Sequence, residues 1–176
     1  MNKIVQDLLA LSKFDAGEVV VDIKPFDINQ SIKNIYDMMI LDIKKQGLEL
    51  IIDIEKQLPE IMGDKSRIEQ VLINIVSNAV RYTPEGGKIT ISAGASGSNI
   101  WIKVSDTGVG IPKEDIPRLF DRFYRVDKAR TRAYGGTGLG LSIAHEIITK
   151  HGGSIQVESE LDKGTDFIIL LPIEGR

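Results

Sequence analysis

The sequence predicts a single α/β domain with a short helical segment in front of it. Segments whose apolar residues recur at helical spacing alternate with segments whose apolar residues recur at every second position. Hydrophobic residues make up 42% of the 176-residue chain, which is enough for one buried core. A glycine-rich stretch at residues 135–141 leads into the last expected helix.

The composition excludes several classes of protein. The net charge of −3 lacks the basic character of a nucleic-acid binder. The chain has no cysteine and only two histidines, which excludes disulfides, cysteine-based zinc sites and histidine-rich metal sites. No apolar run approaches the roughly 20 residues that cross a bilayer, and no signal peptide is visible. We therefore expect a soluble, intracellular chain whose membrane connection, if any, comes from segments outside this sequence.

Residues 1–16 are expected to form a helix. Ile4, Leu8 and Leu11 follow a coiled-coil-like spacing, and Gly17 is a suitable stop. No N-cap is apparent before this pattern. Two interpretations remain open: the segment is the end of a longer helix, or it is a short amphipathic helix packed on its own domain.

Strands and helices alternate from there to residue 82. Pro25 is expected to end a valine-rich strand, and Asp27 and Asp64 are suitable helix N-caps. The expected elements are a strand at 18–23, a helix at 28–46, a strand at 48–54, a loop at 57–63 and a helix at 65–82.

Two asparagines of the helix at 65–82 are unusual for their position. Asn74 and Asn78 lie four residues apart and therefore share one face of the helix. Asparagine is a poor residue inside a helix because its amide competes for backbone hydrogen bonds. The pair indicates a polar task for this face, although two solvated asparagines are the commoner case.

A β-hairpin is expected next, with strands at 88–95 and 99–106. Its second strand runs directly into Asp106-Thr-Gly-Val-Gly110. A carboxylate at a strand end followed by glycines is typical of a ligand-binding loop. A tight turn with an aspartate cap is the alternative.

The connection at 112–137 has little regular pattern beyond a short helical piece at 114–119. Its later part interleaves aromatic and charged side chains and then turns basic: Arg118, Phe120, Asp121, Arg122, Phe123, Tyr124, Arg125, Lys128, Arg130 and Arg132. A connection of this length is usually a functional lid or disordered. The basic residues suit a polyphosphate better than DNA, given the acidic net charge.

The glycine-rich stretch from Gly135 to Leu141 begins a helix that is expected to end near His151, before strands at 154–158 and 166–171. Free N–H groups and the helix dipole make such a place attractive to phosphate. Leu141 stands where a P-loop has lysine, and the third glycine of the dinucleotide fingerprint is missing. A linker or a helix start without a ligand is the alternative.

Taken together and in this order, four motifs resemble the catalytic, ATP-binding domain of sensor histidine kinases, within the wider family of gyrase, Hsp90 and MutL-like ATPases. The stretch Asn74–Thr83 resembles the N box, and Asp106–Gly110 resembles the first glycine box. Phe120–Arg125 resembles the F box, and Gly136–Gly140 resembles the second glycine box. The stretch from Leu8 to Asp15 resembles the end of the second helix of the dimerisation and phosphoacceptor hairpin. The resemblance therefore divides the chain into residues 1–17 of that hairpin and an ATP-binding domain at 18–176.

The resemblance implies a two-layer α/β sandwich, the Bergerat fold. A mixed, mostly antiparallel sheet of about five strands would pack on three helices beside a long ATP lid. ATP and Mg²⁺ are the implied cofactors. Asn78 would hold Mg²⁺ through its amide oxygen, Asp106 would accept a hydrogen bond from the adenine amino group, and Arg125 would reach the γ-phosphate. Asn78 and Arg125 are thus the implied catalytic residues.

The full set of implied ATP contacts is Asn74, Asn78, Arg81, Tyr82, Asp106, Gly108, Gly110, Ile111, Tyr124, Arg125, Gly136, Thr137, Gly138, Leu139, Gly140 and Thr165.

The implied function is that of a protein-histidine kinase in a two-component system, which transfers the γ-phosphate to a histidine on an upstream hairpin. ATP-hydrolysing relatives carry a glutamate where this chain has Asn74, and an amide is no general base. An ATP-gated conformational module or an ATPase acting on a protein partner is the alternative, and a nucleotide-free scaffold is disfavoured. The implied partners are the hairpin, a response regulator receiver domain and a second copy in the full-length protein. Nucleic acid is not expected, and the chain would be the cytoplasmic portion of a membrane-anchored protein.

His145 fits the family's acceptor pattern H-[ED]-x-x-[TN], with Lys150 in place of the usual proline. Because it follows the phosphate loop closely in sequence, we interpret this match as a coincidence. His151 is expected to interact favourably with the dipole at the helix C-terminus. The chain should therefore bind ATP but not phosphorylate itself.

Overall fold

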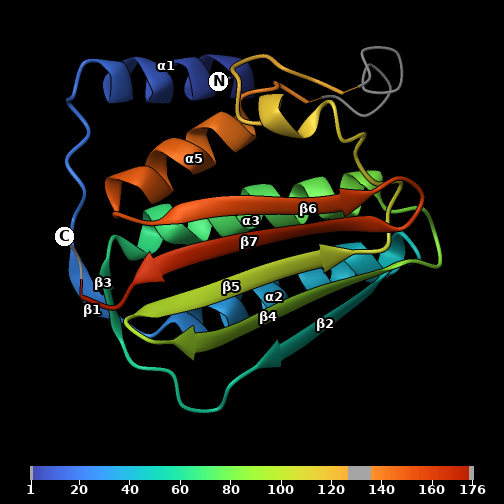
Figure 1. The fold of residues 1–176 in the computed structure, drawn as a ribbon, viewed down its shortest axis with the longest axis horizontal. Helices are drawn as coiled ribbons and strands as arrows, with labels where there is room; N and C mark the ends of the chain where they lie inside the picture. The colour runs from blue at the N-terminus through green and yellow to red at the C-terminus, as the bar shows by residue number, and fades with distance from the viewer. Residues whose placement is uncertain (1, 127–135, 175–176) are drawn as a thin grey trace.

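The computed structural model describes residues 2–126 and 136–174 (Figure 1). Gly135 and the basic residues Lys128, Arg130 and Arg132 lie outside the described residues. The elements are α1 (Lys3–Asp15), β1 (Lys24–Phe26), α2 (Ile28–Lys45), β2 (Glu49–Ile54), β3 (Ile61–Gly63), α3 (Lys65–Tyr82), β4 (Lys88–Ser96), β5 (Asn99–Asp106), a 3₁₀ turn η1 (Ile116–Arg118), α5 (Gly140–Lys150), β6 (Ser154–Glu160) and β7 (Gly164–Pro172).

The main sheet has the strand order β2-β4-β5-β7-β6. Strands β2 and β4 are parallel, and the remaining neighbours are antiparallel. Helix α2 packs on β2, α3 on β5 and α5 on β6, so a helical layer covers one face of the sheet (Figure 1). Side chains alternate between buried and more exposed along β5 and β7, as expected for a sheet covered on one face. This arrangement confirms the predicted two-layer α/β sandwich.

Local capping signals set the starts of the two long helices. Asp27 accepts hydrogen bonds from the N–H groups of Asn29 and Gln30, and α2 begins at the next residue. Asp64 accepts from the N–H of Arg67 at 3.2 Å and starts α3. Both caps satisfy amides that have no partner within the helix. The predicted starts of both helices are therefore confirmed.

Two predictions between residues 18 and 63 are wrong. Residues 18–23 form no strand; instead β1 contains Pro25 and pairs with β3, which lies inside the predicted loop at 57–63. Among the described residues β1 pairs with β3 alone, so its other edge tolerates a proline without an N–H. The far edge of β3 is bonded, because the Met62 N–H donates to the carbonyl oxygen of Ile173 at 3.0 Å. Val20 is 86% exposed, and the N–H of Asp22 donates to the side chain of Asp64 at 3.1 Å. The valine-rich segment thus has no neighbouring strand to pair with.

His151 is the C-cap of α5, at the helix C-terminus as predicted, and it also contacts the start of α3. It is buried, and its Nε2 accepts the N–H of Asp64 at 2.9 Å. Its Nδ1 lies 2.7 Å from the carbonyl oxygen of Ile147, which can only accept, so Nδ1 carries the proton. The ring therefore joins the C-cap of α5 to the N-cap of α3 through two hydrogen bonds, a bridge that the prediction did not include.

Helix α1 packs against α5 and buries Leu11 and Phe14. Asn2 caps it through a hydrogen bond from the N–H of Ile4, a cap that the sequence analysis missed. Large apolar side chains nevertheless remain exposed along α1: Ile4, Val5, Leu8 and Leu9. Among the residues that the structure describes, no helix is long and apolar enough to cross a membrane.

Candidate functional site

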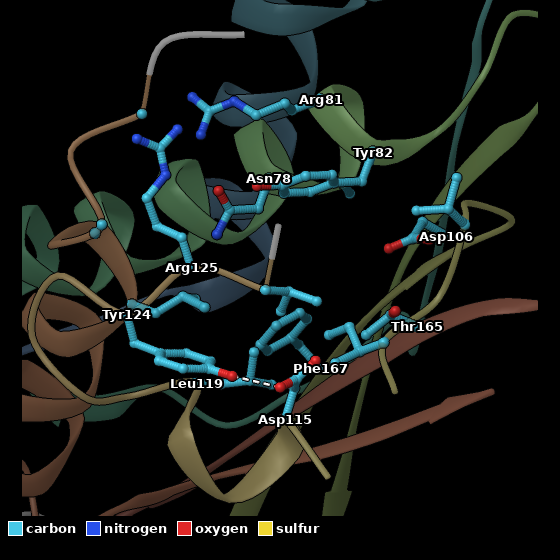
Figure 2. Close-up of a pocket in the computed structure, with 18 of the residues that line it drawn as sticks. Asn78, Arg81, Tyr82, Asp106, Asp115, Leu119, Tyr124, Arg125, Thr165 and Phe167 are labelled. Atoms are coloured by element: carbon cyan, nitrogen blue, oxygen red, sulfur yellow. Dashed lines mark hydrogen bonds between the residues drawn. The ribbon is translucent and has the colours of Figure 1, made fainter. Parts of the chain in front are cut away.

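A cavity of about 430 Å³ opens between α3, the ends of β5 and β7, the segment at 109–126 and the glycine-rich loop (Figure 2). Its size is typical of a small-molecule site. The sequence-predicted residues that line it are Asn74, Asn78, Arg81, Tyr82, Asp106, Gly110, Ile111, Tyr124, Arg125, Gly136, Thr137, Gly138, Gly140 and Thr165. Gly108 and Leu139 do not line the cavity; they support its wall through N–H groups that donate to Asp106 at 2.8 Å and to Thr137 at 3.2 Å.

Helix α3 contributes the polar wall. The amide nitrogen of Asn74 donates to the carbonyl oxygen of Gly140 at 3.3 Å, which ties α3 to the first residue of α5. Within the described part of the chain, the Asn78 amide has no hydrogen-bond partner and faces the cavity (Figure 2). The two asparagines thus have different tasks: Asn74 joins two elements, and Asn78 is available to a ligand.

Asp106 stands at the end of β5 with its carboxylate toward the cavity (Figure 2). Burial raises the pKa of this carboxyl group, while the N–H groups of Gly108 and Thr165 oppose the shift. A cavity-facing, partly desolvated carboxylate is a strong acceptor for a ligand N–H. Gly108 must be glycine for this geometry, because a Cβ there would lie 2.6 Å from the carbonyl oxygen of Tyr82.

A chain of hydroxyl groups holds the neighbouring wall. The hydroxyl of Ser159 donates to the carbonyl oxygen of Gly164 at 2.9 Å and accepts the N–H of Ile111 at 2.8 Å. Thr165 lies 2.8 Å from the same hydroxyl. Because the single hydrogen of Ser159 is already donated, Thr165 is the donor of this bond, and its own oxygen remains an acceptor toward the cavity.

The glycine-rich loop contacts the segment at 120–125 through two residues whose backbones adopt the left-handed conformation. Gly138 has φ +71° and Phe123 has φ +63°. The N–H of Phe123 donates to the carbonyl oxygen of Gly138 at 3.0 Å, and a Cβ on Gly138 would lie 3.0 Å from the Phe123 Cα. Glycine at 138 therefore allows the two backbones to approach.

Two cations converge at the opposite end of the cavity from Asp106. The guanidinium groups of Arg81 and Arg125 point toward the same region (Figure 2). A Cβ on Gly136 would lie 2.5 Å from the Arg81 Nη1, so the loop passes directly over this side chain. Arg81 pairs with no carboxylate among the described residues. Two guanidinium groups beside a glycine loop form a site for an anion.

Several cavity residues were missed by sequence reasoning. They include Lys3, Asp115, Leu119, Leu161 and Phe167. Asp115 accepts a hydrogen bond from the Tyr124 hydroxyl, which contributes to raising the pKa of that tyrosine. Phe167 lies on an inward position of β7, so the alternation of the predicted strand could have indicated it. No local pattern marks Asp115 or Lys3.

Helix α1 reaches the site from the other side. The Thr137 hydroxyl donates to Asp7 at 2.8 Å. Arg122 binds both carboxylate oxygens of Asp15, at 2.6 and 2.7 Å, and lowers the pKa of that carboxyl. α1 therefore contacts the segment at 109–126 as well as the glycine-rich loop.

His145 is exposed on α5 and does not line the cavity. Its ring centroid lies 5.2 Å from that of Phe120. Within the described residues, no group of three or more His, Cys, Asp or Glu side chains is placed to hold a metal ion.

The chain belongs to the family of histidine kinase-, DNA gyrase B- and HSP90-like ATPases, which matches residues 63–175. It is 44% identical to the sensor histidine kinase WalK of Bacillus subtilis and 42% identical to the sensor protein SrrB of Staphylococcus aureus, in each case over 98% of this chain. It spans only 28% and 29% of the length of these relatives. The predicted family is thus confirmed, and the chain is a catalytic domain of the histidine kinase type.

Solved structures agree with this assignment. The catalytic domain of the histidine kinase ThkA is 32% identical, with a TM-score of 0.77 over 87% of this chain and 97% of that one. Full-length ShkA in complex with AMPPNP is 29% identical, with a TM-score of 0.86 over 98% of this chain and 36% of that one. ThkA in complex with the response regulator protein TrrA is 31% identical, with a TM-score of 0.80 over 97% of this chain and 46% of that one. The chain thus belongs to a family of ATPases and has the fold of histidine kinase catalytic domains.

Proposed function

We propose that this chain binds Mg-ATP in the cavity and transfers the γ-phosphate to a histidine on a helical hairpin outside the chain. The observation that carries the proposal is that the two ends of one cavity carry opposite charges. A carboxylate lies at one end, and two arginines and a glycine loop lie at the other. This order matches an adenine base at Asp106 and a triphosphate at Arg81 and Arg125.

The adenine end would read the base by hydrogen bonding. Asp106 accepts from the amino group, and the Thr165 oxygen accepts directly or through a water. Tyr82 and Phe167 line the same cavity and supply apolar surface for the ring.

The phosphate end would hold the nucleotide by charge and by backbone amides. Arg81 and the loop around Gly138 bind the phosphates, and Arg125 reaches the γ-phosphate. Asn78 would hold Mg²⁺ through its amide oxygen, because hard cations take oxygen ligands and Mg²⁺ commonly binds few protein groups beside phosphates. When bound, the ion would neutralise charge on the phosphate oxygens.

Phosphate transfer is favoured over hydrolysis by Asn74. Its amide cannot take a proton from water, and it is already bonded to the Gly140 carbonyl. A hydrolytic ATPase or an ATP-gated module acting on a partner is therefore the weaker candidate.

The acceptor would lie on the hairpin whose second helix ends in α1, so that residues 1–17 belong to the hairpin and 18–176 to the ATP-binding domain. The exposed apolar side chains of α1 suit a helical partner. His145 lies outside the cavity lining, and His151 is buried and bonded on both nitrogens. Neither is suited to receive the phosphate.

Segments like those in the rest of the relatives' length would supply the hairpin, the dimer contact, the sensor and a membrane anchor in the full-length kinase. This chain would then be the cytoplasmic portion of the kinase. The phosphohistidine would pass its phosphate to the receiver domain of a response regulator, as the ThkA–TrrA complex suggests by analogy.

Calorimetric titration with AMPPNP, with and without Mg²⁺, tests the site. We expect binding that Mg²⁺ strengthens in the wild type but not in Asn78→Ala. Asn34→Ala, an exposed asparagine of α2, is the matched control and should behave as wild type. Mg²⁺-independent binding by the folded wild type would refute the metal role.

Radiolabelled ATP tests the transfer. The chain alone should incorporate no stable label, and label should appear in an added hairpin that carries a histidine. Label in the chain itself that disappears in His145→Ala would overturn the assignment of the acceptor.

A further inference from the structure

The Tyr124 side chain is held from two directions. Its hydroxyl donates to the Asp115 carboxylate, and the guanidinium carbon of Arg118 lies 4.3 Å from its ring centroid. Asp115 occupies the position before η1 but makes no capping hydrogen bond there, so its carboxylate is free to serve the tyrosine. The hydrogen bond and the cation–π contact fix both the tip and the face of the ring.

This fixed ring follows a strained backbone position. Phe123 is one of two non-glycine residues with positive φ in the described chain. Such a conformation is strained and persists only where surrounding contacts hold it. The Phe123 N–H is bonded to Gly138, and the Tyr124 N–H donates to the carbonyl oxygen of Asp121 at 3.2 Å. The strained residue therefore lies between a backbone contact with the glycine loop and the anchored Tyr124 side chain.

Tyr124 separates the strained Phe123 from Arg125 in the chain. Figure 2 shows that Tyr124 and Arg125 leave the backbone in opposite directions. The ring points toward Asp115, and the guanidinium points toward Arg81. If the tyrosine were released from Asp115, the turn could relax and the arginine would no longer be directed to this end of the cavity.

We propose that Asp115 is a positioning residue that acts through Tyr124 to hold Arg125 in place for recognition of the nucleotide's terminal phosphate. This inference rests on the proposed function, in which Arg125 contacts the γ-phosphate. Asp115 also lines the cavity, so a direct contact with the nucleotide is the competing explanation. The two explanations differ in whether the effect of Asp115 depends on the tyrosine.

The test compares the affinities of the full chain for AMPPNP and for ADP, both with Mg²⁺, by calorimetry. The measured quantity is the preference for the ligand that carries the third phosphate. We expect Asp115→Ala to lower this preference about tenfold, which corresponds to the loss of one well-placed charged contact, while ADP affinity changes less than about threefold. Glu114→Ala, which removes the same charge from the exposed neighbouring residue, should leave the preference unchanged.

A double-mutant cycle then separates positioning from direct contact. In the Tyr124→Phe background, Asp115→Ala should have no further effect on the preference, because the hydrogen bond is already absent. Asp115→Asn should retain most of the preference, because its amide oxygen can still accept from the tyrosine. Independent, multiplying effects of the two changes, or an equal loss of ADP and AMPPNP affinity, would overturn the proposal.

Arg125→Ala distinguishes this inference from the function on which it rests. If Arg125→Ala removes the preference and Asp115→Ala does not, only the positioning role fails. If the wild type shows no preference, or if Arg125→Ala leaves it unchanged, the proposed role of Arg125 fails and the inference fails with it. Thermal unfolding of each variant confirms that the comparison is made between folded proteins.

Discussion

Replacing Asp106 by asparagine tests two effects of the buried carboxylate separately: its contribution to nucleotide binding and its effect on the stability of the protein without nucleotide. One carboxylate oxygen already accepts the Gly108 N–H at 2.8 Å. Asparagine has a single acceptor oxygen, so either Gly108 or the adenine amino group would then face an NH₂ donor. The loss of a charge-assisted hydrogen bond costs about 1.5–3 kcal/mol, which weakens ADP binding about 10- to 150-fold.

The same substitution should not destabilise the protein without nucleotide. Burial raises the Asp106 pKa above the ordinary value of 3.8, so the folded state binds this proton more tightly than the unfolded state. The carboxylate's contribution to stability therefore falls as pH rises from 3.8 through the raised pKa, and it is unfavourable at neutral pH. Asp106→Asn removes this penalty, and its unfolding midpoint at pH 7 should equal or exceed that of the wild type.

Calorimetry with ADP and with IDP checks the base recognition. IDP carries a carbonyl oxygen where ADP carries the amino group, so the wild type should prefer ADP, and Asp106→Asn should lose or invert this preference. Asp166→Asn, on the neighbouring strand and paired with Lys103 at 3.6 Å, is the control and should keep it. An Asp106→Asn variant that binds ADP as tightly as the wild type, with the same preference over IDP, would refute the reasoning.

Three further changes probe the framework of the site. His151→Phe leaves the buried Asp64 N–H without its acceptor, so the free energy of unfolding measured in urea should fall by about 1–3 kcal/mol. An unchanged urea midpoint would contradict the role of His151 as a bridge between the two helices. Gly110→Ala places a Cβ against the Glu160 carbonyl oxygen at φ +72°, so the thermal midpoint should fall, with the backbone conformation alone costing about 1–2 kcal/mol. Asn74→Asp places a carboxylate beside the carbonyl oxygen of Gly140, the first residue of α5. Calorimetry should then show weaker AMPPNP binding, and wild-type affinity would argue against a role for the bond between α3 and α5.

Local signals made much of the fold predictable. The caps at Asp27 and Asp64 act within one turn of the helix that they start, so a short window of sequence contains the whole cause. The hairpin of β4 and β5 is similarly local. The small sheet was not predictable in this way, because β1 and β3 lie far apart in the chain and the pairing tolerates Pro25 only at a free edge.

Some residues of the candidate site likewise have a local signal in the sequence, and others do not. The motifs around Asn78, Asp106 and Gly138 stand out in the sequence because glycines and mid-helix asparagines are locally unusual. Asp115 does not stand out, because its role depends on Tyr124 arriving beside it. The residues that face the ligand can therefore be identified from the sequence more readily than the residues that hold them in place.

The sequence by itself determined the helices, the hairpin and the order of the ligand motifs, because spacing and capping are properties of neighbouring residues. Only the tertiary structure decided which distant groups meet. It paired His151 with the start of α3, Asn74 with the start of α5, and Thr137 with Asp7 of α1. Each of these bonds joins residues that are neighbours only after the core has packed, and that packing brings the motifs together around one cavity.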